Sequence, residues 1–129
     1  MMGGNAKHLV MIVEDDRAVR ESIVEVLEDH DYQPMVASNG KEAIERLRAE
    51  GTKPCVILLD IMMPVMDGWE FRALQEADPE LGAIPVVVLS AHADIEEAVS
   101  GMRADGALQK PIHLQTLLAT VERFCRGSS

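Results

Sequence analysis

Residues 55–60 read CVILLD, an uninterrupted apolar run that ends in a carboxylate. Two similar runs occur elsewhere, LVMIV at Leu9–Val13 and VVVL at Val86–Leu89. Continuous β-prone runs of this length are typical of strands buried on both faces, as in a parallel sheet. The three runs therefore predict the central strands of such a sheet.

Two weaker runs complete the set of predicted strands. Tyr32–Ala37 contains Pro34, which cannot donate a backbone hydrogen bond and therefore favours an edge strand. Ala107–Gln109 is short and also indicates an edge. Both runs are predicted to lie at the margins of the sheet.

Amphipathic segments separate the apolar runs and predict helices. Behind Asp16, a candidate N-cap, apolar residues recur at helical spacing as far as Leu27. Four more such stripes follow, one of them behind a second candidate N-cap, Asp94. Strands and helices thus alternate five times.

This alternation predicts an α/β fold, a doubly wound five-stranded parallel sheet with right-handed crossovers. With the weak strands at the edges, the expected order is 2-1-3-4-5, the flavodoxin-like (βα)5 arrangement. The expected domain spans residues 7–126, with flexible tails at 1–6 and 127–129.

Polar side chains follow the predicted strands. Glu14 and Asp15 come after the first strand, and Asp60, Ser90 and Lys110 come at the ends of the third, fourth and fifth. Because the carboxyl ends of parallel strands share one edge of the sheet, and strands one and three are neighbours in this order, these side chains are expected to converge.

The converging groups are those needed to transfer a phosphoryl group to an aspartate. Three carboxylates in one crevice repel one another and attract a cation, and oxygen ligands favour Mg²⁺, with Mn²⁺ as an alternative. Lys110 adds a positive charge and Ser90 a hydroxyl donor. Each residue alone also suits a helix cap, a turn or a solvated surface, and only their conjunction favours the chemistry.

Four segments then show a resemblance to a known family. They read VMIVEDDRAVRE at Val10–Glu21, VILLDIMMPVMDGWEF at Val56–Phe71, PVVVLSAHAD at Pro85–Asp94 and ALQKPI at Ala107–Ile112. The chain resembles, over about residues 7–125, the receiver domain of two-component response regulators, in particular single-domain, chemotaxis-regulator-like members.

The resemblance implies a role for each acidic residue. Asp60 resembles the phosphoacceptor, and Glu14 and Asp15 resemble the acidic pair. Asp15 would bind Mg²⁺ directly and Glu14 mostly through water, while the backbone carbonyl of Met62 would complete the protein's share of the metal shell.

The resemblance also covers the switch residues, where the chain departs from the family pattern. Ser90 resembles the hydroxyl residue that moves toward the phosphoryl group, and Lys110 the family lysine, with a cis bond expected before Pro111. Ala107 stands where many receivers carry Tyr or Phe, and Ile112 stands where Phe is common. The output surface is therefore expected to use other packing.

Two further side chains carry a hypothesis about the lifetime of the phosphorylated state. Met62 and His92 lie two residues after Asp60 and Ser90, where receivers line the path of the hydrolytic water. Either they set the hydrolysis rate of the acyl phosphate, or they only fill the entrance to the site.

The implied function is a phosphorelay switch. It takes a phosphoryl group from a histidine kinase or phosphotransfer protein onto Asp60 with Mg²⁺, then binds an unknown protein target in trans. It is expected to catalyse its own phosphorylation and slow dephosphorylation, and not to be a metabolic enzyme.

Three alternatives stay open. The first is a degenerate receiver that acts as a phosphorylation-independent scaffold. The second is an aspartate-based phosphatase, although Met62 stands where such enzymes usually carry a second acid. The third is a nucleotide- or flavin-binding domain, which the lack of a glycine-rich loop after the first strand disfavours.

Composition narrows the class of partner. The formal net charge of −10 argues against binding to nucleic acid or an anionic membrane. No apolar run is long enough for a membrane span or a secretory signal, so the expected location is cytoplasmic, as a monomer or weak dimer. Cys55 and Cys125 are expected to be small buried hydrophobes, and the lack of a CxxC motif or Cys/His cluster disfavours a zinc or redox site.

Overall fold

A computed structural model of the chain describes residues 8–49, 53–61, 66–91 and 95–127. In chain order its elements are β1 (His8–Val13), α1 (Arg17–Asp29), β2 (Tyr32–Ala37), α2 (Gly40–Ala49), β3 (Val56–Asp60), α3 (Gly68–Ala77), α4 (Pro79–Gly82), β4 (Val86–Ser90), α5 (Ile95–Met102), β5 (Gly106–Gln109), α6 (Leu114–Glu122) and a π-helical turn, η2 (Arg123–Gly127).

The five strands form one parallel sheet in the order β2-β1-β3-β4-β5. Val13 of β1 lies opposite Leu59 of β3, and Asp60 lies opposite Leu89 of β4. The predicted doubly wound order is therefore confirmed. Both weak runs are edge strands, with Pro34 on the outer strand β2.

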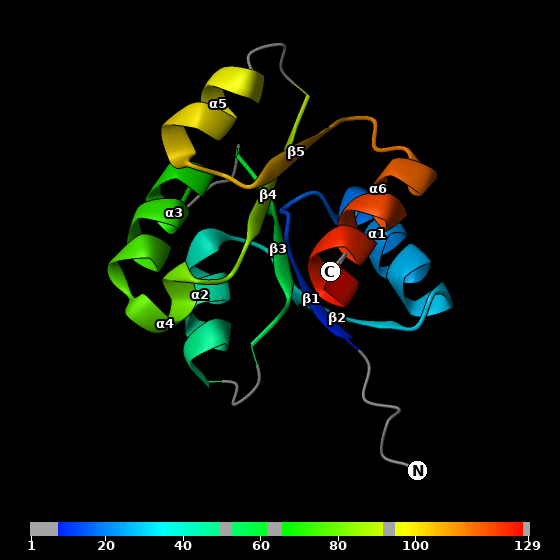
Figure 1. The fold of residues 1–129 in the computed structure, drawn as a ribbon, viewed down its shortest axis with the longest axis horizontal. Helices are drawn as coiled ribbons and strands as arrows, with labels where there is room; N and C mark the ends of the chain where they lie inside the picture. The colour runs from blue at the N-terminus through cyan, green and yellow to red at the C-terminus, as the bar shows by residue number, and fades with distance from the viewer. Residues whose placement is uncertain (1–7, 50–52, 62–65, 92–94, 128–129) are drawn as a thin grey trace.

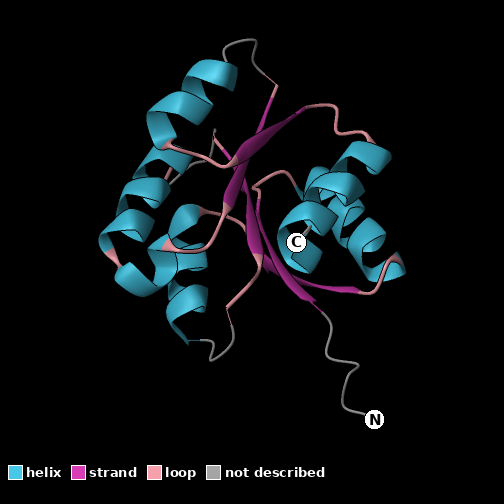
Figure 2. Cartoon of the chain, viewed as in Figure 1, coloured by secondary structure: helices cyan, strands magenta, loops and turns pink. Residues whose placement is uncertain are grey.

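Helices cover both faces of the sheet (Figures 1 and 2). In Figure 1, α1 and α6 lie on one face, and α2, α3, α4 and α5 lie on the other. Successive side chains along each inner strand point to opposite faces of the sheet, so each strand contributes to the hydrophobic clusters on both faces. On β1, Val10 and Ile12 pack in the cluster beneath α1 and α6, whereas Met11 and Val13 pack in the opposite cluster.

Local polar contacts fix where two helices begin. Asp16 caps α1, because its side chain accepts a hydrogen bond from the backbone of Val19 at 3.1 Å, and this prediction is confirmed. Asp67 and Glu70 form a reciprocal capping box at the start of α3. The predicted N-cap Asp94 lies outside the described residues.

The short helix α4 was not predicted from the sequence. Asp78 caps it by accepting hydrogen bonds from the backbone of Glu80 and Leu81, and Pro79 occupies a first-turn position. Leu81 is its only fully buried residue. One turn with one apolar anchor is too short to show a helical period.

The prediction that both cysteines are small buried hydrophobes is wrong, because both are only partly buried and they are bonded to each other. Cys55, just before β3, and Cys125, in η2, form a disulfide with their Cα atoms 5.1 Å apart. The chain positions differ by 70 residues, and only the return of the C-terminal helix to the sheet brings them together. Each cysteine taken alone reads as a small hydrophobe.

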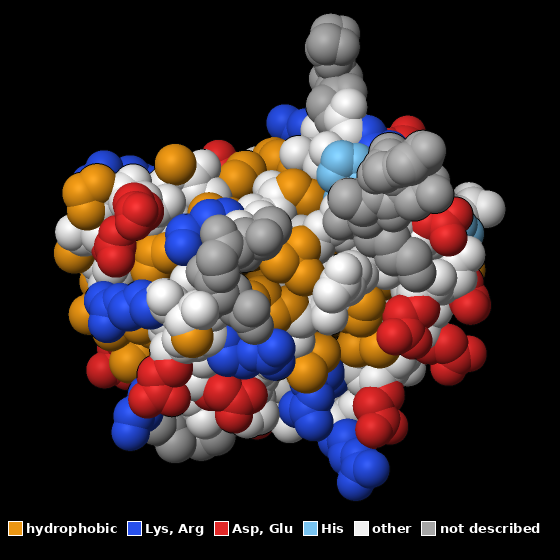
Figure 3. All heavy atoms as spheres, turned by 90° about the horizontal axis from the view of Figure 1, so that it is seen from below, with side chains coloured by type: hydrophobic (Ala, Val, Ile, Leu, Met, Phe, Trp, Pro, Cys, Tyr) orange, Lys and Arg blue, Asp and Glu red, His pale blue; other side chains and the backbone are white. Residues whose placement is uncertain are grey.

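The surface carries charges of both signs. On the face shown in Figure 3, acidic and basic side chains lie among exposed hydrophobic atoms. No helix in the described part of the chain is both long and apolar enough to cross a bilayer.

A buried arginine joins α3 to the end of α5. Arg72 donates to the backbone carbonyls of Met102 at 2.8 Å and Arg103 at 2.7 Å, and to the Gln75 side chain at 2.7 Å. The last carbonyls of a helix have no partner within it, so Arg72 satisfies two acceptors at this end of α5. Gln75 in turn donates to the backbone of Leu81 and Ile84.

Replacing Arg72 by leucine should destabilise the fold strongly. The change leaves two backbone carbonyls and one side-chain amide oxygen without a donor in a buried setting, which should cost about 2–4 kcal/mol in the free energy of unfolding. Urea titration of the variant and the parent chain measures this difference.

Arg48→Leu is the matched control. Arg48 is mostly exposed and pairs with Asp78 only at 3.9 Å. Its loss should cost less than about 1 kcal/mol. Equal losses for the two variants would show that the Arg72 contacts do not hold α5.

Candidate functional site

The predicted site residues lie together at the carboxyl ends of the strands. Glu14 directly follows β1, Asp60 ends β3 and Ser90 ends β4. All three are buried, with exposed fractions of 0%, 5% and 4%. Lys110 follows β5, and its backbone N–H donates to the carbonyl of Ser90 at 2.8 Å.

Three carboxylates meet at this rim. Glu14, Asp15 and Asp60 each offer one oxygen, and these oxygens all lie within 4.8 Å of one another. Glu14 and Asp60 are buried and Asp15 is exposed, so the cluster opens to solvent on one side. The predicted convergence of the first and third strand ends is confirmed.

Lys110 is the counter-charge to this cluster. Its Nζ lies 2.8 Å from Glu14 Oε1 and 3.5 Å from Asp60 Oδ1. The ammonium group therefore stands between the innermost carboxylate and the end of β3. The Lys110–Pro111 peptide bond is cis, as the resemblance implied.

The turn after β1 holds Glu14 through its backbone and one carboxylate oxygen. Arg20 donates to the backbone carbonyl of Glu14 at 2.8 Å, and the Asp16 N–H donates to Glu14 Oε2 at 3.1 Å. Oε1 is buried, and its partner among the described residues is the Lys110 ammonium group at 2.8 Å.

These oxygens fit a small divalent cation. Three carboxylate oxygens within 4.8 Å of one another, one of them on the exposed Asp15, form a donor set that a hard cation would satisfy. The donor set is entirely oxygen, which suits Mg²⁺ or Mn²⁺ and disfavours metals that prefer sulfur or nitrogen.

Burial and charge change the ionisation of this site. Desolvation, followed by the hydrogen bond and the charge of Glu14, raises the pKa of Asp60 to about 7 against the opposing effect of Lys110. Burial alone would lower the Lys110 pKa, but the hydrogen bond with Glu14 and the charges of Asp60 and Glu14 raise it overall.

A glycine allows the chain to pass close to Asp60. A Cβ on Gly68 would lie 2.9 Å from the Ile61 Cα and 3.1 Å from the Asp60 carbonyl oxygen. The Gly68 N–H donates to the Ile61 carbonyl at 2.9 Å. The start of α3 is thereby packed against the end of β3, which holds Asp60 in place.

Of the three remaining predicted residues, the structure describes only Ala107. Met62 and His92 lie outside the described residues, so the proposed metal carbonyl and the hydrolysis hypothesis stay predictions. Ala107 lies on β5 opposite Val88 and is exposed. Its small side chain leaves this part of β5 without the aromatic group common in receivers.

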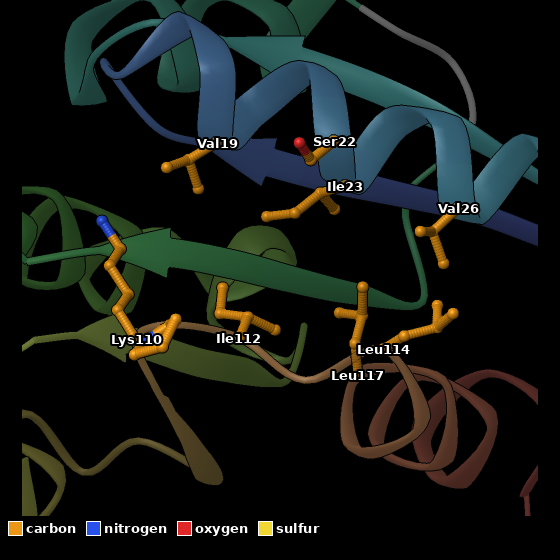
Figure 4. A pocket seen from close by; sticks show the side chains of 9 residues that line it. Val19, Ser22, Ile23, Val26, Lys110, Ile112, Leu114 and Leu117 are labelled. Carbon is orange, nitrogen blue, oxygen red and sulfur yellow. The ribbon is translucent and has the colours of Figure 1, made fainter.

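The sequence did not indicate two further features of the site. Arg20 lies one turn into α1 and gave no signal beyond an ordinary exposed helix position. An apolar groove of about 260 Å³ lies between α1 and the segment after β5 (Figure 4). Its walls are formed by Val19, Ser22, Ile23 and Val26 on one side and by Lys110, Pro111, Ile112, Leu114 and Leu117 on the other.

The doubly wound sheet, with three acids beside a lysine at its carboxyl rim, is the arrangement that the resemblance to receiver domains implied. The family model for the response regulator receiver domain matches residues 10–122. The chain therefore belongs to the receiver domains of two-component response regulators, and the family and the acidic pocket together support a general phosphoacceptor role.

Individual relatives agree with this assignment. The response regulator MprA of Mycolicibacterium vanbaalenii is 37% identical over 123 residues, which are 93% of this chain and 51% of that protein. The chain thus spans about half the length of the curated relatives it matches.

Solved structures show the same fold. The chemotaxis protein CheY4 of Vibrio cholerae aligns with a TM-score of 0.83 and 28% identity, over 92% of this chain and 99% of that one. The phosphorylated cyanobacterial phytochrome response regulator RcpA aligns with a TM-score of 0.79 and 29% identity, over 96% and 97% of the two chains.

The raised pKa of Asp60 predicts how stability depends on pH when no divalent cation is present. A carboxyl with a pKa of about 7 in the folded state and 3.8 when unfolded keeps its proton longer in the native protein. Stability should therefore fall as the pH rises from about 4 to about 7, and level off above that.

Asp60→Asn removes this dependence and should stabilise the metal-free protein at pH 8. The gain should be on the order of 1–3 kcal/mol, since each pKa unit corresponds to about 1.4 kcal/mol. Urea titrations of both proteins in chelator from pH 4 to 8 measure it. Parallel pH profiles for the two proteins would contradict the prediction.

Proposed function

We propose that this chain is the phosphoacceptor switch of a phosphorelay, with Asp60 as the residue that becomes phosphorylated. The observation that carries the proposal is the buried Glu14–Lys110–Asp60 arrangement, with the two contacts at 2.8 and 3.5 Å. It holds a carboxylate nucleophile beside a fixed positive charge and within reach of a cation site.

The reaction transfers a phosphoryl group from a phosphohistidine of a histidine kinase or phosphotransfer protein. A carboxylate oxygen of Asp60 forms a bond to phosphorus as the bond between phosphorus and the histidine nitrogen breaks, and the imidazole leaves with its electron pair. Asp60 must be ionised to attack, and Lys110 favours the ionised form.

The other residues prepare the place where the phosphoryl oxygens will lie. Lys110 is already close to Asp60 and can contact one of these oxygens without a large movement. Ser90 ends the neighbouring strand β4 and can donate its hydroxyl to another. These donors act on charge that grows during transfer, where fixed polar groups are most effective.

A divalent cation would be held by Asp15 and Asp60, with Glu14 at the back of the site and the Met62 carbonyl completing the protein ligands. Mg²⁺ is the preferred ion, with Mn²⁺ as an alternative, given the all-oxygen donor set. When bound, it supplies Lewis-acid charge neutralisation for the phosphoryl group.

Phosphorylation then shifts a two-state equilibrium that a protein target reads. Ser90 and Lys110 are joined by a backbone hydrogen bond, so a rearrangement of one strand end is transmitted to the other. The target, the oligomeric state, binding in trans and a cytoplasmic location stay predictions from the sequence. Slow autodephosphorylation, tuned by Met62 and His92, belongs with them.

A degenerate receiver that serves as a scaffold is the second candidate. The exposed Ala107 favours it, because the side chain that couples phosphorylation to output in many receivers is lacking. Phosphorylation of Asp60 distinguishes the two candidates, because only the switch should accept a phosphoryl group.

Intact-mass spectrometry after incubation with acetyl phosphate and Mg²⁺ tests the proposal. The chain should gain one phosphoryl group, and both Asp60→Asn and omission of Mg²⁺ should abolish the gain. Absence of the gain in the parent chain, with acetyl phosphate and also with phosphorylated histidine kinases as donors, would favour the scaffold.

We expect the donor protein to dock in the apolar groove beside Lys110, because the groove is lined by Lys110, whose ammonium group lies 3.5 Å from Asp60. Leu114 lines the groove and is 48% exposed, so Leu114→Asp should not harm the fold. It should slow phosphotransfer from a phosphorylated kinase about tenfold or more. Labelling by acetyl phosphate, which needs no docking surface, should stay unchanged.

Leu74→Asp provides the control. Leu74 is 41% exposed, much like Leu114. It belongs to α3, a helix that lies on the face of the sheet opposite to α6 (Figure 1). Equal slowing by both substitutions, or by neither, would remove the groove from the proposed docking surface.

A further inference from the structure

The disulfide between Cys55 and Cys125 lies at the opposite end of β3 from the phosphoacceptor. Cys55 precedes the first residue of β3 and Asp60 is its last. Five residues of extended chain span about 17 Å, so the two sites do not overlap. The thiol pair is thus a separate chemical site, and it takes no part in the chemistry at Asp60.

The backbone positions of the two cysteines suit a disulfide bond. The two Cα atoms lie 5.1 Å apart, inside the usual range of about 4.4–6.8 Å for disulfides. Both side chains are partly buried at the edge of the core cluster beneath α1 and α6. Partial exposure gives a small thiolate access to the sulfur atoms.

The reduced form is also accommodated. The Cys55 backbone N–H donates to the Leu9 carbonyl at 2.9 Å, and the Cys55 sulfur lies 3.2 Å from the same oxygen. As a thiol, Cys55 can donate its S–H to this acceptor, whereas a disulfide sulfur has no proton to give. Cys125 as a thiol would pack as a small hydrophobe.

The bond restrains a segment that has few other anchors. The segment is α6 and η2, residues 114–127, and within it only Leu117 and Val121 are fully buried. Within η2 itself, Phe124 packs partly on the core and Arg126 stacks over the Tyr32 ring at 5.1 Å. Within the described residues, the disulfide is the only covalent cross-link between the side chains of this segment and the rest of the chain.

We propose that Cys55 and Cys125 are a reversible redox site that tethers the C-terminal segment to β3 when oxidised and releases it when reduced. The oxidant is a small-molecule disulfide such as glutathione disulfide. The two protein thiols lose two protons and two electrons as their sulfur–sulfur bond forms, and the reagent is reduced to two thiols. A glutathione-rich compartment drives the reverse reaction.

Release would loosen one wall of the groove beside Lys110. Leu114 and Leu117 of α6 line this groove, and η2 directly continues α6 (Figure 4). The redox state of the pair therefore controls how firmly the α6 side of the groove is held, while the acidic cluster at the rim is unaffected.

Alkylation tests whether the pair exists. The full chain is equilibrated with defined mixtures of glutathione and glutathione disulfide, then denatured in the presence of N-ethylmaleimide and weighed intact. No adduct is expected in the oxidising mixtures and two in the reducing ones. Two adducts in every mixture, or stable glutathione adducts on the protein in place of the internal bond, would overturn the proposal.

Hydrogen exchange tests what the bond does. Exchange of the backbone amides of residues 123–127 should rise about tenfold or more on reduction, while β1 should not change. Equal exchange in both states would overturn the tether. Both readouts are independent of phosphorylation, so they stand or fall separately from the proposed function.

Single substitutions supply the controls. Cys125→Ser and Cys125→Ala should both exchange like the reduced parent chain in every mixture, and in the reducing mixtures each should leave one thiol to alkylate. Acetyl phosphate labelling of Asp60 should be the same in the oxidised and reduced parent chain. A tenfold loss of labelling on oxidation would contradict the separation of the two sites.

Discussion

Negative charges can share a buried crevice only if a positive charge stands among them, and in this protein that charge is Lys110. Glu14 is completely buried and its Oε1 has Lys110 as an ion-pair partner at 2.8 Å. Removing one partner of such a pair would leave a desolvated charge, which is among the costliest defects a fold can carry. The chain after β5 must therefore reach across the rim toward the end of β1.

Several local features serve this single constraint. Arg20 and Asp16 hold the turn that carries Glu14, and the backbone N–H of Lys110 bonds to Ser90. The close approach of Gly68 to Ile61 holds the end of β3, which carries Asp60. A site that holds repelling carboxylates this close together is suited to take up a cation, because a positive charge relieves their mutual repulsion.

The rim and strand β5 differ in how closely they follow the receiver pattern. The acids, Ser90 and Lys110 all lie on the carboxyl rim, and they agree with the receiver pattern. Ala107 departs from that pattern on β5, and the far end of α5 is held by Arg72 from α3. A receiver can thus keep its acceptor site while changing how its surface responds.

The sequence by itself determined the strand order and the identity of the rim residues. Continuous apolar runs mark central strands, and a parallel sheet places a polar residue that directly follows such a run at its carboxyl edge, so the positions of Glu14 and Asp60 could be predicted. Lys110 follows a weak edge run, and its position was predicted from the alternation of strands and helices. Only the tertiary structure decided the pairing of Cys55 with Cys125, the buried contacts of Arg72 and the groove beside α6. These depend on how helices far apart in the chain pack on the sheet, and residue spacing carries no information about such contacts.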